Sequence, residues 1–188
     1  MTEAEPAGHQ PPSAADIAVV AAQLGRPPRG VTAIAHRCPC GLPDVVETAP
    51  RLPDGTPFPT LYYLTCPRAT AAVSRLEAAG LMREMTARLG ADSGLRAAYL
   101  AAHIGYLARR RAAAVRAGVP PPGGGGAAGA DLAEPSSEVS AGGMPDRVKC
   151  LHALVAHELA VPGSNPLGRE AIAAAGHWWD GGRCVQPD

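Results

Sequence analysis

Apolar residues recur every three or four positions between residues 17 and 24, which predicts an amphipathic helix near the start of the chain. Ser13 and Asp16 have the spacing of a capping box at its beginning, and Gly25 followed by Pro27 ends it. Short runs rich in β-branched or aromatic residues follow, separated by segments with Pro and Gly, at Val31–Ala35, Val45–Thr48 and Leu61–Thr65. We expect these runs to pair as a small antiparallel sheet.

The spacing of apolar residues becomes helical again after residue 66, and it predicts two short helices up to about residue 90. A longer helix is expected from about Asp92 to Ala117. Residues 118–142 consist mainly of Gly, Pro, Ala and Ser without an apolar face, which predicts a flexible linker. A second helical block should run from near Pro145 to about Leu159, and a short last helix should lie within 165–175.

These patterns predict an α+β fold. A small antiparallel sheet would be flanked by helices, with a C-terminal helical block packed back across the flexible linker. The expected boundaries are a disordered tail at 1–12, an α+β core at 13–117, the linker at 118–142, a helical segment at 143–179 that completes the same domain, and a tail at 180–188.

The long predicted helix has two candidate faces for burial. One face combines aromatic and polar residues, Tyr99, His103, Tyr106 and Arg110. The adjacent stripe is apolar, with Leu100, Ile104 and Leu107. We expect the apolar stripe to be half-buried, with the Tyr and His side chains at its margin. Alternatively, the polar face forms the wall of a pocket opposite Arg147 and Lys149.

The composition restricts the function classes. The formal net charge is zero, so no bulk electrostatic attraction to nucleic acid is expected. No apolar run has the length of a membrane span, and the first residues lack the basic and apolar regions of a signal peptide. We therefore expect a cytoplasmic protein. In that reducing compartment, five Cys are expected to be free thiols, metal ligands or redox groups rather than disulfides.

Three cysteines lie at the ends of predicted elements. Cys38 follows the first strand, Cys66 lies between the third strand and a helix that starts with proline, and Cys150 lies in the C-terminal helical block. A thiolate at Cys66 would be stabilised by the helix dipole. If these elements meet at one edge of the sheet, four thiolates, with Cys40 as the fourth, or three thiolates with His152 or His36, would suit zinc or an iron–sulfur cluster. Reduced core or loop cysteines are the alternative.

Residues 143–157 concentrate charged, thiol and imidazole side chains, and they include Lys149, the only lysine of the chain. An ammonium group can lose its proton, whereas a guanidinium practically cannot. We expect Arg147 and Lys149, together with His103, to contact a cofactor or a bound anion, or to offset the charge of nearby thiolates. The alternative for Lys149 is an ordinary solvated side chain.

Four segments occur along the chain in this order: PDGTPFPTLYYLTCP, SRLEAAGLMREM, AYLAAHIGYLARRR and GMPDRVKCLHALVAHELA. Over about residues 30–176 the chain resembles the domain of unknown function 501 family, a set of small, mainly actinobacterial proteins. The genes of that family often lie near a septum-initiator gene and an exopolyphosphatase gene. The resemblance implies a polar core of Cys38, Cys66, His103, Cys150 and His152, with Cys40 as an optional addition.

We therefore predict a cytoplasmic protein that binds zinc or an iron–sulfur cluster through Cys38, Cys66 and Cys150. Their sulfur atoms would lie within about 4 Å of each other, and His103 or His152 would complete or support the site. One alternative is a metal-free interaction or regulatory module, whose partner would be a cell-division or envelope protein. Another is a thiol-dependent enzyme with Cys66 or Cys150 as nucleophile. No P-loop and no H-E-x-x-H motif is present, and no catalytic residue is assigned.

Overall fold

The computed structural model describes residues 10–52, 54–58, 60–119, 140–182 and 184–185. Most of the predicted linker and of the predicted N-terminal tail lies outside them. The described strands are β1 (Val31–Arg37), β2 (Pro43–Thr48) and β3 (Tyr62–Leu64). The described α-helices are α1 (Ala14–Leu24), α2 (Pro67–Ala78), α3 (Leu81–Ala91), α4 (Ser93–Arg116), α5 (Leu151–Ala160) and α6 (Pro166–Ala175). None of them combines the length and hydrophobicity that a membrane crossing requires.

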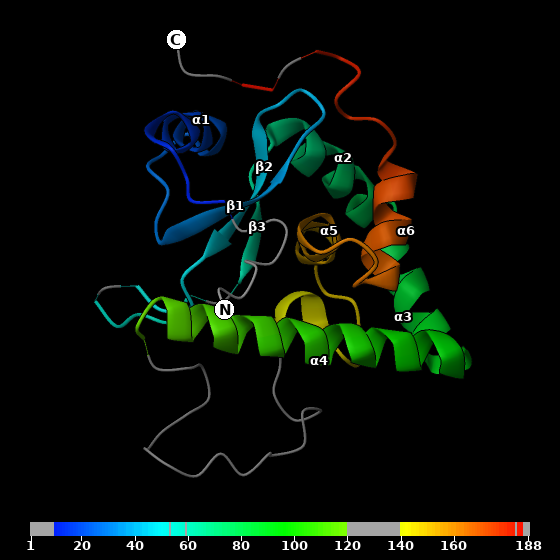
Figure 1. Cartoon of the computed structure of the whole chain (residues 1–188). Coiled ribbons are helices and arrows are strands. Elements are labelled where there is room, and N and C mark those ends of the chain that lie inside the picture. The colour runs from blue at the N-terminus through cyan, green and yellow to red at the C-terminus, as the bar shows by residue number, and fades with distance from the viewer. Residues whose placement is uncertain (1–9, 53, 59, 120–139, 183, 186–188) are drawn as a thin grey trace, which may run out of the picture.

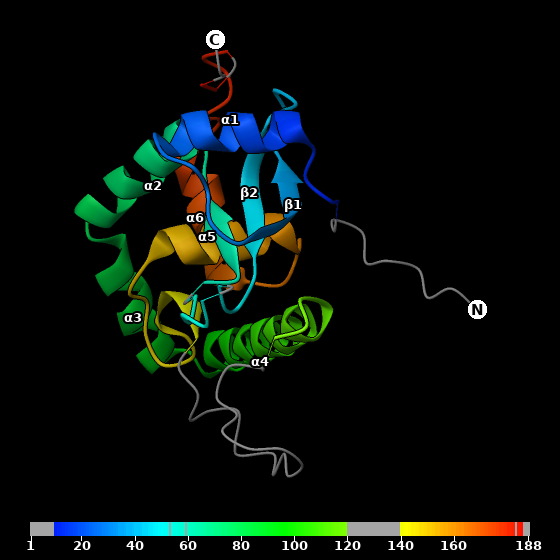
Figure 2. The ribbon, with the colours of Figure 1, turned by 90° about the vertical axis from the view of Figure 1, so that its left-hand side faces the viewer.

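The three strands form an antiparallel sheet in the order β1-β2-β3, which confirms the predicted α+β class. All six residues of the central strand β2 are buried, because helices cover both faces of the sheet. Successive side chains of a strand point to opposite faces. Val46 accordingly packs with Ile34 of β1 and Val20 of α1, whereas Val45 belongs to the large core that contains α5. Figures 1 and 2 show the sheet between these two helices.

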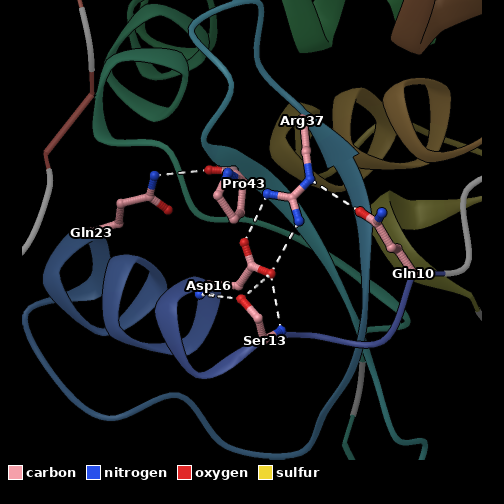
Figure 3. Close-up of polar contacts among 6 residues, drawn as sticks. All are labelled: Gln10, Ser13, Asp16, Gln23, Arg37 and Pro43. Carbon is pink, nitrogen blue, oxygen red and sulfur yellow. Dashed lines mark hydrogen bonds and ion pairs between the residues drawn. The ribbon is translucent and has the colours of Figure 1, made fainter.

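Polar contacts attach both ends of α1 to the sheet (Figure 3). The predicted capping box is present, since the Asp16 backbone N–H donates to Ser13 Oγ at 3.1 Å and the Ser13 N–H donates to the Asp16 carboxylate at 3.0 Å. Arg37 of β1 binds both oxygens of that carboxylate, at 2.8 and 3.1 Å, and holds the pKa of Asp16 at about 2. At the other end, Gln23 Nε2 donates to the Pro43 carbonyl at 2.8 Å.

The long helix α4 buries its aromatic and polar face, contrary to our expectation. Tyr99, His103 and Tyr106 are fully buried, whereas Leu100 is 36% exposed and Ile104 is 44% exposed. The expected apolar stripe is therefore the more exposed of the two, except at Leu107, which is buried. Figure 1 shows α4 running beneath the sheet and α5, so the buried face looks toward the core.

Hydrogen bonds explain why this polar face can be buried, because a buried hydroxyl or imidazole is tolerated when it has a partner. Tyr106 Oη accepts from the Leu61 backbone N–H at 2.6 Å, and Tyr99 Oη donates to the Arg147 carbonyl at 3.3 Å. His103 Nδ1 lies 2.9 Å from Ser140 Oγ. The two Tyr rings meanwhile contribute large apolar surfaces to the core.

The C-terminal helical block begins later than we predicted. α5 starts at Leu151 rather than near Pro145, and Cys150 is its N-cap. A compact loop precedes it, in which the Lys149 N–H donates to the Gly142 carbonyl at 2.7 Å. Gly142 and Gly143 have φ values of 72° and 91°, which side chains with a Cβ rarely adopt. Two side chains of the loop, Met144 and Val148, pack in the core and fix its position.

α5 and α6 approach each other most closely at Gly168. A Cβ atom at this position would lie 2.2 Å from the Leu154 carbonyl oxygen, which belongs to the backbone of α5. Only glycine therefore allows this helix–helix contact without displacing one helix. The contact places α6, and the chain that follows it, beside α2 (Figure 1).

We expect Gly168→Ala to lower the free energy of unfolding by about 1–3 kcal/mol, because a methyl group would force the helices apart. Gly90→Ala in α3 is the matched control, since nothing lies within 4 Å of a Cβ there and alanine favours a helix. Urea denaturation of both variants measures the difference. Equal stability of the two variants would contradict the close contact.

His157 of α5 is buried among aromatic rings. Its ring stacks on Tyr62, with centroids 6.0 Å apart, and meets Tyr106 edge-on at 5.1 Å. The side chain is fully buried, and this burial, with a smaller effect of the Arg109 charge, lowers the pKa of His157 to about 3. The imidazole is therefore neutral in the folded protein at neutral pH.

The buried His157 should make stability depend on pH. Between the ordinary histidine pKa of 6.5 and about 3, the unfolded chain takes up a proton that the folded chain does not. The free energy of unfolding should consequently fall as the pH falls through this window, by up to about 1.4 kcal/mol per pH unit from this group. His157→Phe should reduce that slope in denaturation curves. His177→Gln replaces a side chain that is 70% exposed, so it should leave the slope of stability against pH unchanged. Equal slopes in wild type and both variants would show that His157 is not the source of the pH dependence.

Candidate metal centre

Four cysteine thiols gather where the β1–β2 turn, the start of α2 and the C-terminal segment meet. The sulfur atoms of Cys38, Cys40 and Cys184 all lie within 4.8 Å of one another. Cys40 Sγ is 3.8 Å from Cys184 Sγ, and Cys66 Sγ is 2.9 Å from the same atom. Cys40 is partly exposed, and the other three are buried. Cys184 thus contacts thiols from two other segments of the chain.

The turn between β1 and β2 fixes the first two thiols. The Cys38 N–H donates to the Leu42 carbonyl at 2.9 Å, and the Gly41 N–H donates to the Cys38 carbonyl at 2.8 Å. These bonds close a tight turn directly after β1. Because the turn contains both cysteines of the Cys38-Pro39-Cys40 sequence, it presents two thiols that are two residues apart in one short loop.

Backbone geometry at the start of α2 positions the third thiol. Cys66 is the N-cap of α2, and Pro67 is its first residue, as the sequence predicts. The Cys66 side chain makes no capping hydrogen bond, so its sulfur is free to contact Cys184. Two residues after Cys66, Arg68 Nη1 donates to the Gly182 carbonyl at 2.8 Å and holds the C-terminal segment beside α2.

The thiols differ in their tendency to ionise. Burial, followed by the contact with Cys40 and the charge of Asp44, raises the pKa of Cys38 to about 11. Burial and the neighbouring sulfur of Cys66 raise the pKa of Cys184 as well. Burial opposes ionisation of Cys40 too, but backbone hydrogen bonds from Cys184 and Leu42 bring its pKa below the ordinary value. Of Cys38, Cys40 and Cys184, Cys40 is therefore the thiol most ready to act as a thiolate.

A second group of potential ligands lies at the N-terminus of α5. One atom each of Glu77, Cys150 and His152 lie within 4.8 Å of one another, and all three residues are partly exposed. His152 Nδ1 is 3.1 Å from Glu77 Oε1 and 3.9 Å from Cys150 Sγ. The contact with Cys150 first, and the charge of Glu77, raise the pKa of His152 to about 9.

The structure divides the predicted metal ligands between these two groups. Cys38 and Cys66 lie with Cys184, whereas Cys150 and His152 lie with Glu77. The expectation that Cys38, Cys66 and Cys150 share one site therefore does not describe the observed grouping. The physical reason is that Cys150 precedes α5, whose first turn packs against α2 near Glu77: the Leu151 N–H donates to Glu77 Oε1 at 2.7 Å.

The residues predicted to bind a cofactor are also separated. Arg147 and Lys149 line one open hollow of about 510 Å³ with residues of α3, including Arg83. His103 is buried in the core beside Ser140 and is not among the residues that line this hollow. His36, the other histidine considered as a ligand, pairs with the fully buried Asp44 at 2.7 Å.

One member of the cysteine group, Cys184, is not among the ligands that the sequence predicts, because it lies in a segment expected to be a tail. Cys40 is predicted as an optional addition to Cys38. The C-x-C spacing was a usable signal for Cys40, because both thiols lie in one turn. No local pattern marks Cys184, since its role depends on the path that the chain takes after α6.

Comparison with known proteins agrees with the sequence resemblance. Residues 34–173 match the family described as "Protein of unknown function (DUF501)", and the chain belongs to this family. The match includes Cys38, Cys40, Cys66 and Cys150, and it ends before Cys184. No curated protein and no solved structure shows a significant match to the chain.

In metal-free protein near neutral pH, we expect iodoacetamide to modify Cys40 faster than Cys38 or Cys184. Only the thiolate reacts, and Cys40 is both the more exposed thiol and the one whose pKa is lowered. Peptide mass spectrometry at successive times gives the rate at each cysteine. Faster modification of the buried Cys38 would show that the order of ionisation is incorrect.

Proposed function

We propose that the chain binds one zinc ion through Cys38, Cys40, Cys66 and Cys184. The observation that carries this proposal is the convergence of four thiols from three segments. A zinc ion bonded to four sulfur atoms at about 2.3 Å places neighbouring sulfurs about 3.8 Å apart in a tetrahedron. The Cys40–Cys184 separation is 3.8 Å, and Cys38, Cys40 and Cys184 lie within 4.8 Å of one another. Cys66 contacts Cys184 but is not within 4.8 Å of all three, so its thiol would move inward to become the fourth ligand.

The short sulfur separations favour a single ion over an iron–sulfur cluster. In a [4Fe–4S] cluster each cysteine binds a different iron atom, and in a [2Fe–2S] cluster each iron atom binds two cysteines. Here three sulfur atoms, those of Cys38, Cys40 and Cys184, lie within 4.8 Å of one another, which is more than a single iron of either cluster would hold. Tetrahedral coordination by four sulfurs is typical of zinc, although a single iron ion can adopt it.

A centre with four cysteine ligands has no free coordination position, so its role is structural rather than catalytic. Zinc would connect the β1–β2 turn and the start of α2 to Cys184, which is 118 residues after Cys66. Because the ligands are distant in the sequence, the binding free energy would contribute to the stability of the folded chain. This role agrees with a cytoplasmic protein that acts through its surface as an interaction module.

The contact between Cys66 and Cys184 favours one other function. At 2.9 Å these sulfurs are closer than the edges of a tetrahedral zinc site, so zinc binding would require them to separate by about 1 Å. Formation of a disulfide would instead require them to approach to about 2.05 Å. The second candidate is therefore a reversible disulfide between these two cysteines, which responds to the redox state of the compartment.

Elemental analysis after expression in zinc-supplemented medium tests the proposal. Cys184→Ser and Cys38→Ser should each remove about one equivalent of zinc per chain relative to wild type, because a structural site depends on all of its ligands. Cys150→Ser is the matched control, since Cys150 lies in the other group, and it should retain the equivalent that Cys184→Ser loses.

The proposal fails if Cys184→Ser retains as much zinc as wild type after the same purification. If the chain contains no zinc and a Cys66–Cys184 disulfide is found by non-reducing peptide mapping, the redox function replaces it. Iron in place of zinc would keep the ligand assignment and change the identity of the metal.

A further inference from the structure

We propose that Glu77, Cys150 and His152 form a second metal site that has an open coordination position. This site is separate from the four-cysteine centre, and it can bind metal whether or not the four-cysteine centre does. The three side chains come from α2 and from the start of α5, and they supply one oxygen, one sulfur and one nitrogen donor. This donor set suits zinc, which accepts carboxylate, thiolate and imidazole ligands.

The separations of the donor atoms fit one ion. With zinc bonds of about 2.0–2.3 Å, the edges of a tetrahedron are about 3.3 Å between oxygen and nitrogen and about 3.5 Å between nitrogen and sulfur. The observed separations are 3.1 Å from Glu77 Oε1 to His152 Nδ1 and 3.9 Å from His152 Nδ1 to Cys150 Sγ. The third separation, from the Glu77 carboxylate to Cys150 Sγ, is at most 4.8 Å, so shifts of about 1 Å or less would bring the three atoms to bonding distance from a common ion.

The hydrogen bonds of His152 orient its imidazole as in a metal ligand. Nε2 lies 3.2 Å from the Thr70 carbonyl oxygen, which can only accept a hydrogen bond. Nε2 must therefore carry the proton. Without a metal the raised pKa of His152 keeps Nδ1 protonated toward the Glu77 carboxylate as well, and a zinc ion would displace that one proton and bind Nδ1 between Glu77 and Cys150. A histidine that binds a metal usually donates its other N–H to a carbonyl or carboxylate in this way.

The carboxylate is held in place by the backbone of α5. Glu77 Oε1 accepts from the Leu151 N–H at 2.7 Å, at the N-terminal end of the helix, where negative charge is favoured. One thiolate and one carboxylate would balance the two positive charges of a zinc ion. The site would thus be neutral, in contrast to the four-cysteine centre.

Three protein ligands leave the fourth zinc position for water or another small ligand. The site can be reached by such a ligand, because the side chains of His152 and Glu77 are 25% and 23% exposed. Lys149, the neighbour of Cys150, lines the open hollow with Arg83 and Arg147, and no acidic residue lines it. The three metal ligands do not line this hollow, and the link between the two is that Lys149 directly precedes Cys150. A small anion such as phosphate is therefore the class of fourth ligand that the neighbouring charge favours.

Equilibrium dialysis against zinc, followed by elemental analysis, tests the site on the full chain. Wild type should bind two equivalents. Cys150→Ser and His152→Ala should each bind one, and Glu77→Gln should bind the second equivalent at least tenfold more weakly. His177→Ala removes an exposed histidine and should retain two. Circular dichroism of each variant establishes that it is folded.

Cobalt(II) distinguishes the two centres. A Cys184→Ser protein should still give the spectrum of a cobalt site with a single thiolate, and this spectrum should change when phosphate is added. The proposal is overturned if Cys150→Ser and His152→Ala bind as much metal as wild type. If Cys184→Ser alone loses metal, the second site is absent and the four-cysteine centre is present. If Cys150→Ser and His152→Ala lose metal and Cys184→Ser does not, the second site is present and the four-cysteine centre is absent.

Discussion

The packing of α5 between the sheet and α6 is the interaction on which the rest of the structure depends. The small sheet needs a cover on the face opposite α1, and the buried residues Leu151, Leu154 and Val155 provide it. Gly168 lets α6 approach the backbone of α5, which directs the following chain past α2. Both candidate metal sites follow from this arrangement, because Cys150 begins α5 and Cys184 follows α6.

The elements of the fold could be predicted from the sequence because their signals are local. The capping box at Ser13, the β-branched runs of the strands and the proline after Cys66 each act within a few residues. The prediction was wrong for the face of α4 because periodicity measures hydrophobicity and not hydrogen bonding. Tyr99 and Tyr106 are buried there because the Arg147 carbonyl and the Leu61 N–H are placed to pair with their hydroxyl groups.

The candidate sites could be predicted only in part. The residue types were recognisable, since Cys38, Cys66, Cys150 and His152 all lie in one of the two groups. The division of these ligands into two sites could not be predicted, because it depends on which helix the loop before α5 contacts. That loop places Cys150 at Glu77, an ordinary acidic residue of α2, and leaves the position beside Cys66 to a cysteine from the far end of the chain.

If four cysteines hold one zinc ion, X-ray absorption spectroscopy at the zinc edge will detect their sulfur atoms around the metal. The zinc-loaded Cys150→Ser protein is the one to measure, because its second site lacks the sulfur ligand. We expect a single shell of four sulfur atoms at about 2.3 Å. A shell dominated by nitrogen or oxygen at about 2.0 Å would show that the four cysteines do not bind the ion.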